Sequence, residues 1–89
     1  SYDIQLLLQL IPEGIDGSIQ VMIDRPWESQ GGSLLGTIEL KTDMPKVSTE
    51  LTAELPALTE LTGKHAIYLK FSSATKEKSL CTLETLVFK

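Results

Sequence analysis

Apolar and polar residues alternate with a period of two through most of this chain. Tyr2, Ile4, Leu6, Leu8 and Leu10 fall on one face of such a pattern, with polar residues on most positions between them. Residues 18–24 and 64–71 alternate in the same way. Because successive side chains of a β-strand point to opposite faces of the sheet, each stretch is predicted to be a half-buried strand.

Turn-forming residues separate these stretches about every ten residues. Pro12-Glu13-Gly14 and Asp16-Gly17 end the first stretch, and a longer loop covers residues 25–32. Further strands are predicted at residues 33–41, 47–55 and 79–88. Residues 48–61 also have leucines at helical spacing, but Pro56 argues against one continuous helix there and favours a strand before it. Short turns on either side of the proline remain an alternative. Six short strands without a long helix predict an all-β fold, an antiparallel β-sandwich.

Size and charge restrict the functions that are compatible with the chain. Its 89 residues are predicted to form a single domain, residues 1–89. The net charge of −4 and the scattered lysines argue against a nucleic-acid partner, which would require a clustered basic face. No apolar run approaches the roughly 18 residues of a membrane span. The chain shows no signal peptide, so a secretion signal, if the protein has one, is expected to have been cleaved off or to lie upstream.

Catalytic motifs are absent from the sequence, and we therefore predict that the domain is not an enzyme. There is no phosphate-binding glycine loop and no metal-ligand spacing. Cys81 is the only cysteine and His65 the only histidine. His65 lies in the strand predicted before that of Cys81, but no third residue completes a triad. We expect Cys81 to be a small, buried strand residue.

Several segments resemble carbohydrate-binding modules of family 6. Residues 61–71 (LTGKHAIYLKF), followed by a polar loop and residues 79–88 (SLCTLETLVF), are similar to the hairpin that ends these modules. Residues 17–24 (GSIQVMID) and 32–40 (GSLLGTIEL) are similar to two of their earlier strands. The resemblance covers about the C-terminal two-thirds of the family's domain. It implies a jelly-roll, galactose-binding-like sandwich that lacks N-terminal strands in this chain, which would then be part of a larger protein.

The family also implies a function and a location. Its members are ancillary, non-catalytic domains of secreted glycoside hydrolases that bind a polysaccharide or oligosaccharide, so a secreted or periplasmic protein is expected. Two other functions remain open. The domain could be a structural sandwich that packs against a neighbouring catalytic domain, or against another chain that completes it. It could also be an adhesin-like protein-interaction domain.

Sugar recognition needs flat apolar faces with polar groups beside them. Trp27, the only tryptophan, is the predicted stacking platform, with Arg25 and Glu28 as hydrogen-bonding neighbours and Tyr68 as an alternative aromatic surface. The family places a tryptophan before the strand at residues 47–55, where this chain has Lys46 or Val47. It places an asparagine before the last strand, where this chain has Ser79 and no asparagine anywhere. The family's usual cleft therefore lacks two of its sugar-binding groups.

The resemblance finally implies a structural calcium ion. Family members hold it with a glutamate near the N-terminus and an aspartate in the last strand, and Glu84 occupies the second position with a longer side chain. Calcium takes six to eight oxygen ligands. The N-terminal glutamate has no counterpart here, and the simpler expectation for Glu84 is an outward-facing strand residue.

Overall fold

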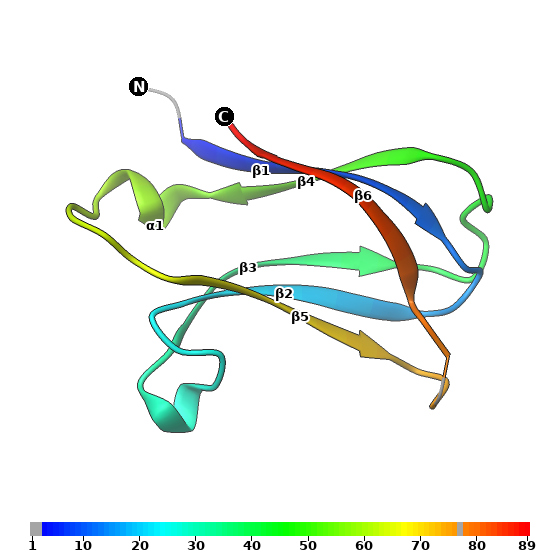
Figure 1. Ribbon diagram of the computed structural model, residues 1–89, viewed down its shortest axis with the longest axis horizontal. Helices are drawn as coiled ribbons and strands as arrows, with labels where there is room; N and C mark the ends of the chain where they lie inside the picture. Colours follow the sequence, from blue (N-terminus) through cyan, green and yellow to red (C-terminus); the bar gives the residue numbers. More distant parts are fainter. Residues whose placement is uncertain (1–2, 77) are drawn as a thin grey trace.

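Within the described residues, six antiparallel strands form two three-stranded sheets that pack face to face (Figure 1). The computed structural model describes residues 3–76 and 78–89. One sheet has the strand order β4-β1-β6 and the other β3-β2-β5. The strands are β1 (Ile4–Pro12), β2 (Gly17–Ile23), β3 (Ser33–Leu40), β4 (Thr49–Leu55), β5 (Ile67–Ser73) and β6 (Cys81–Phe88). The predicted antiparallel β-sandwich is confirmed; the jelly-roll connectivity stays a prediction.

The two central strands supply most of the core. Leu6, Leu8 and Leu10 of β1 are fully buried, as are Ile19 and Val21 of β2. These are inward positions of the period-two pattern, so the sequence alternation correctly identified the buried face. Full burial of one such side chain contributes about 1.5–3 kcal/mol. The central strands are therefore the principal source of stability in a domain of this size.

Pro56 determines how the chain leaves β4. The strand ends at Leu55, and a single helical turn, α1 (Pro56–Thr59), begins with the proline in its first turn. Proline is tolerated there because its missing N–H has no helical partner in any case. The preference for a strand before Pro56 is thus confirmed, and the continuous helix over residues 48–61 is excluded.

The predicted C-terminal hairpin is wrong. β5 pairs with β2 of one sheet, whereas β6 pairs with β1 of the other, so the loop between β5 and β6 crosses from sheet to sheet. The period-two pattern is identical for a hairpin and for this crossover, because each strand has one buried face in both cases. Strand positions could therefore be predicted from the sequence, but this pairing could not.

The two long edges of the sandwich differ. At one edge β3 and β4 pack together, and a Cβ atom at Gly36 would lie only 3.0 Å from Leu55 Cδ2 and 3.2 Å from the main-chain oxygen of Glu54. At the other edge β5 and β6 diverge with distance from their connecting loop (Figure 1). Within the described residues each sheet has three strands, so β5 and β6 are each paired on one side only.

Candidate functional site

Trp27 lies in a compact loop between β2 and β3. Its main-chain oxygen accepts hydrogen bonds from the amides of Gln30 and Gly32, both at 3.0 Å, and a single 3₁₀ turn covers Glu28–Gln30. Gly31 closes that turn with a φ of 97°, a left-handed conformation that glycine adopts without strain. The loop backbone is therefore held by its own hydrogen bonds, which restricts the orientations open to the indole.

The indole ring is exposed and carries a cation on one face. Trp27 is 54% exposed, and Lys70 Nζ lies 3.8 Å from the ring centroid, a cation–π contact. Lys70 and the half-buried Tyr68 are two residues apart on β5 and point to the outer face of its sheet, away from the core. Trp27 thus folds over the outside of the sheet β3-β2-β5 while most of its surface remains accessible.

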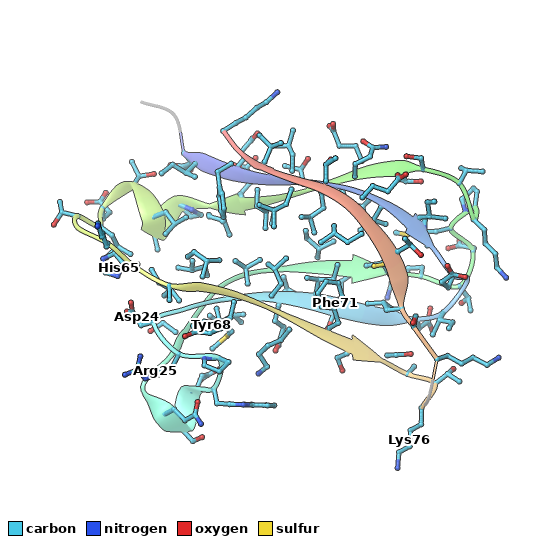
Figure 2. All side chains as sticks on the ribbon, viewed as in Figure 1. Asp24, Arg25, His65, Tyr68, Phe71 and Lys76 are labelled. Atoms are coloured by element: carbon cyan, nitrogen blue, oxygen red, sulfur yellow. The ribbon has the colours of Figure 1, made fainter. Side chains whose placement is uncertain are left out.

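Arg25 and Glu28 lie in the same loop as Trp27, as the sequence indicates. Arg25 Nη1 donates a 2.8 Å hydrogen bond to the main-chain oxygen of Asp24, and both Arg25 and Glu28 are exposed. Figure 2 shows Arg25 beside Asp24 at the end of the sandwich that also holds His65. The predicted group of Trp27, Arg25 and Glu28 therefore remains together, and Tyr68 lies on the neighbouring strand.

Ser79 lies at the opposite end of the molecule from the Trp27 loop. It lines a polar cleft of about 510 Å³. Lys46 also lines this cleft, and its stem packs against Gly14, where an added Cβ would stand 3.0 Å from Lys46 Cε. The complete lining is Glu13, Gly14, Ile15, Lys46, Thr75, Lys78 and Ser79. Ser79 and Lys46 come together here, but the lining contains no aromatic ring on which a sugar could stack.

Glu84 faces outward on β6 and takes part in a short polar chain. Ser48 Oγ donates a 2.6 Å hydrogen bond to Glu84 Oε1 and accepts one of 2.7 Å from Gln9 Nε2. Within residues 3–76 and 78–89, no group of three or more acidic, histidine or cysteine side chains is arranged to hold a metal ion. The residues around Glu84 do not fit the six to eight oxygens that calcium requires.

A histidine–aspartate pair is the feature that sequence reasoning missed. His65 Nδ1 lies 2.8 Å from Asp24 Oδ1, and His65 Nε2 lies 2.8 Å from the main-chain oxygen of Thr62. Only a protonated imidazole donates from both nitrogens at once. The Asp24 carboxylate, and then the Thr62 carbonyl, raise the pKa of His65 above its usual value. The two residues are 41 positions apart in the sequence, so no local pattern predicts the pair. In the structure Asp24 adopts a left-handed backbone conformation with a φ of 73°.

We expect the pKa of His65 to lie above 6.5 and to fall when Asp24 is replaced by asparagine. Asparagine keeps the shape and tolerates the left-handed backbone, but it lacks the charge. Because the folded-state pKa is raised, the stabilisation is fully present below pH 6.5 and is lost as pH rises through the folded-state pKa. An NMR titration of the ring is unambiguous, since His65 is the only histidine. Equal midpoints in the wild type and Asp24→Asn would contradict the assignment.

Cys81 and His65 do not form a catalytic pair. Cys81 begins β6 opposite Pro12, whereas His65 precedes Ile67, which lies opposite Ile23 at the other end of the sandwich. Burial, and secondarily the negative charge of Glu13, raise the pKa of the Cys81 thiol. Both effects disfavour the nucleophilic thiolate.

An apolar cavity opens between the sheets where β5 and β6 are farthest apart. Its volume is about 280 Å³, below the roughly 300–1,000 Å³ of most small-molecule sites. Its walls are Ile4, Leu58, Leu61, Gly63, His65, Ile67 and Phe88. Its size and lining suit a few apolar side chains better than a sugar.

Comparison of the chain with protein-family models, with curated proteins and with solved structures found no match. In the described parts of the chain, no helix has the length and apolar character needed to span a membrane.

Proposed function

We propose that this domain is a non-catalytic carbohydrate-binding module, ancillary to a secreted carbohydrate-active enzyme, with Trp27 as its stacking platform. The observation that carries the proposal is the accessibility of Trp27, which is 54% exposed although its loop is fixed by internal hydrogen bonds. An indole held at the surface by an ordered loop offers a flat apolar face to a ligand, and the loop need not be ordered on binding. The sequence resemblance to family 6 modules supports the same conclusion.

The chemistry around the ring suits a sugar. The C–H face of a pyranose stacks on an indole, and the side chains beside it can bond the equatorial hydroxyls. Arg25 supplies donors and Glu28 supplies acceptors from the same loop, while the Lys70 ammonium group lies against the ring. Since the loop is already ordered, little conformational entropy is lost on binding. Bound to its polymer, such a module raises the local concentration of an attached enzyme.

Replacing Trp27 with alanine is expected to remove most of the sugar affinity. Loss of one stacking platform should cost about 1–3 kcal/mol, by analogy with base–aromatic stacking. Titration calorimetry with xylan, β-glucan and galactan oligomers would measure the loss. Trp27→Tyr is the matched control, because it keeps a flat ring and should retain part of the affinity. Equal binding by wild type and Trp27→Ala would move the site to the sheet face around Tyr68, and no binding by either would contradict the proposal.

A second candidate function is a structural one, in which the sandwich packs against a neighbouring catalytic domain or another chain without binding sugar. The specific observation in its favour is the apolar edge formed by β5 and β6. Phe71 is 48% exposed and Phe88 43% exposed, although both lie opposite fully buried residues of the central strands. If the wild-type domain binds none of the sugars in calorimetry, and if this edge is buried in a larger assembly, the structural candidate is favoured.

A further inference from the structure

The turn at residues 62–65, between α1 and β5, is held by the side chain of His65. Main-chain hydrogen bonds end on one side with the Leu61 amide and resume on the other at Ala66, whose oxygen accepts from the Asp24 amide at 2.9 Å. Within the described residues, no main-chain hydrogen bond joins the four residues between them to the rest of the molecule. The ring of His65 supplies the bonds that fasten this turn.

This ring bridges two acceptors from different parts of the chain. Its Nδ1 atom lies 2.8 Å from Asp24 Oδ1, directly after β2, and its Nε2 atom lies 2.8 Å from the main-chain oxygen of Thr62, within the turn. Figure 2 shows His65 on the connection between α1 and β5, with Asp24 beside it. A carboxylate and a carbonyl both accept, so the two bonds exist together only while the imidazole is protonated.

Loss of the proton breaks one of the two bonds. A neutral imidazole has a single N–H, so its other nitrogen would face an oxygen at 2.8 Å with lone pair against lone pair. The bond to the Asp24 carboxylate is charge-assisted and therefore stronger than the bond to a neutral carbonyl. The contact of His65 with Thr62 is thus the one that opens, and it is the contact that closes the turn.

The same turn forms one side of the apolar cavity between the sheets. Leu61, Gly63 and His65 are three of the residues that line this cavity. Gly63 has a φ of 82°, and no atom lies within 4 Å of a Cβ added to it, so the turn projects from the rest of the molecule. A segment with few packing contacts and few hydrogen bonds opens at low cost. A change in the turn therefore changes access to the cavity.

Asp24 is the charged group in direct contact with His65. Arg25 follows it, but Arg25 Nη1 is bonded to the main-chain oxygen of Asp24. The other elements around the cavity present uncharged residues, which are Ile4 of β1, Leu58 of α1, Ile67 of β5 and Phe88 of β6. The charged residues that adjoin these walls or lie in the turn are all exposed, and they are Asp3, Glu60, Lys64 and Lys89. The pKa of His65 is accordingly raised, first by the bond with Asp24 and then by the bond with Thr62.

We propose that His65 is a pH-sensitive latch: its protonated ring fastens the turn at residues 62–65 to the end of β2, and loss of the proton releases the Thr62 side of the turn and widens the mouth of the apolar cavity. Because the folded-state pKa is raised above 6.5, the latch is closed at pH 6.5 and below and opens as pH rises through the folded-state pKa. This inference goes beyond the proposed function and does not depend on sugar binding at Trp27.

The test is an NMR titration of the 89-residue chain from about pH 5 to about pH 9, which brackets the range in which a histidine titrates. Ring shifts report the protonation of His65, and carbon relaxation at the Cα atoms of the turn reports its order without interference from amide exchange. We expect the order parameter of Gly63 to fall from about 0.85 to below about 0.6 through the midpoint of the ring titration. That of Gly31, in a turn closed by a main-chain bond, should not change. Equal order of Gly63 on both sides of the midpoint would overturn the proposal.

Two variants separate the bridge from the charge of the turn. His65→Gln has no ring to titrate and cannot make both charged bonds, so Gly63 should be mobile at every pH. Lys64→Gln removes a neighbouring charge but neither bond, so its turn should still be released with the titration of His65. An ordered Gly63 in His65→Gln at low pH would contradict the latch. The wild-type titration decides if that variant does not fold.

Access to the cavity is measured separately with the fluorescent apolar dye ANS. We expect the wild type to bind at least about twofold more dye above the midpoint than below it, and His65→Gln to bind equally at both pH values. ANS is an anion, so loss of the positive charge of His65 would by itself weaken binding. Constant or weaker binding above the midpoint would overturn the opening of the cavity. Trp27→Ala should show the wild-type transition, so the latch and sugar binding fail separately.

Discussion

Leu8→Ala is expected to destabilise the domain by about 2–5 kcal/mol, the range for removing a leucine from a packed core. Leu8 is fully buried at the centre of its sheet, opposite Leu51 of β4 and Leu86 of β6. A chain of this length has a total stability of only about 4–13 kcal/mol. The variant therefore loses a large share of its folding free energy, and its melting temperature should fall by about 8 °C or more.

Leu86→Ala is the matched control, because it removes the same atoms from the residue directly opposite. Leu86 is 41% exposed, so less apolar surface returns to water and little cavity forms. We expect less than half the loss seen for Leu8→Ala. Urea denaturation followed by far-UV circular dichroism measures both. If the two losses were equal, the edge strand would contribute as much to the core as the centre, contrary to the structure.

The strands could be predicted from the sequence because alternation and turn residues are local signals. β3 begins at the predicted Ser33, and β4 ends at the predicted Leu55. Alternation does not report which strands pair, and so the crossover between β5 and β6 was predicted wrongly as a hairpin. For the same reason, alternation does not predict that Phe71 is exposed. An inward-facing position is buried only if the opposite sheet covers it.

The candidate site was predictable in part, for the same reason. Trp27, Arg25 and Glu28 are neighbours in sequence and stay together in one loop. Ser79 lies at the other end of the sandwich, where it meets Lys46 in a polar cleft. The contacts of Trp27 with Lys70 and of Asp24 with His65 join residues about forty positions apart. They exist only because β5 pairs with β2, which no local pattern specifies.

Gly32→Ala is expected to destabilise the domain by about 1–3 kcal/mol, the usual cost of forcing extra atoms into a tightly packed place. A Cβ at this position would collide with the main-chain oxygen of Arg25 and lie 2.9 Å from the main-chain oxygen of Trp27. Both are backbone atoms, which cannot move aside as a flexible side-chain end can. To relieve the contact, the loop must open and give up the 3.0 Å hydrogen bond from the Gly32 amide to Trp27.

Opening of the loop should also disturb the proposed sugar platform, so this variant links stability to function. The neighbouring Gly31 is the control: no atom lies within 4 Å of its added Cβ, and asparagine tolerates its left-handed backbone. Gly31→Asn should therefore change stability by less than about 1 kcal/mol. Urea denaturation reports the stability, and Trp27 fluorescence reports release of the ring, since Trp27 is the only tryptophan. Similar stability and emission in the two variants would show that close backbone packing at Gly32 does not hold Trp27 in place.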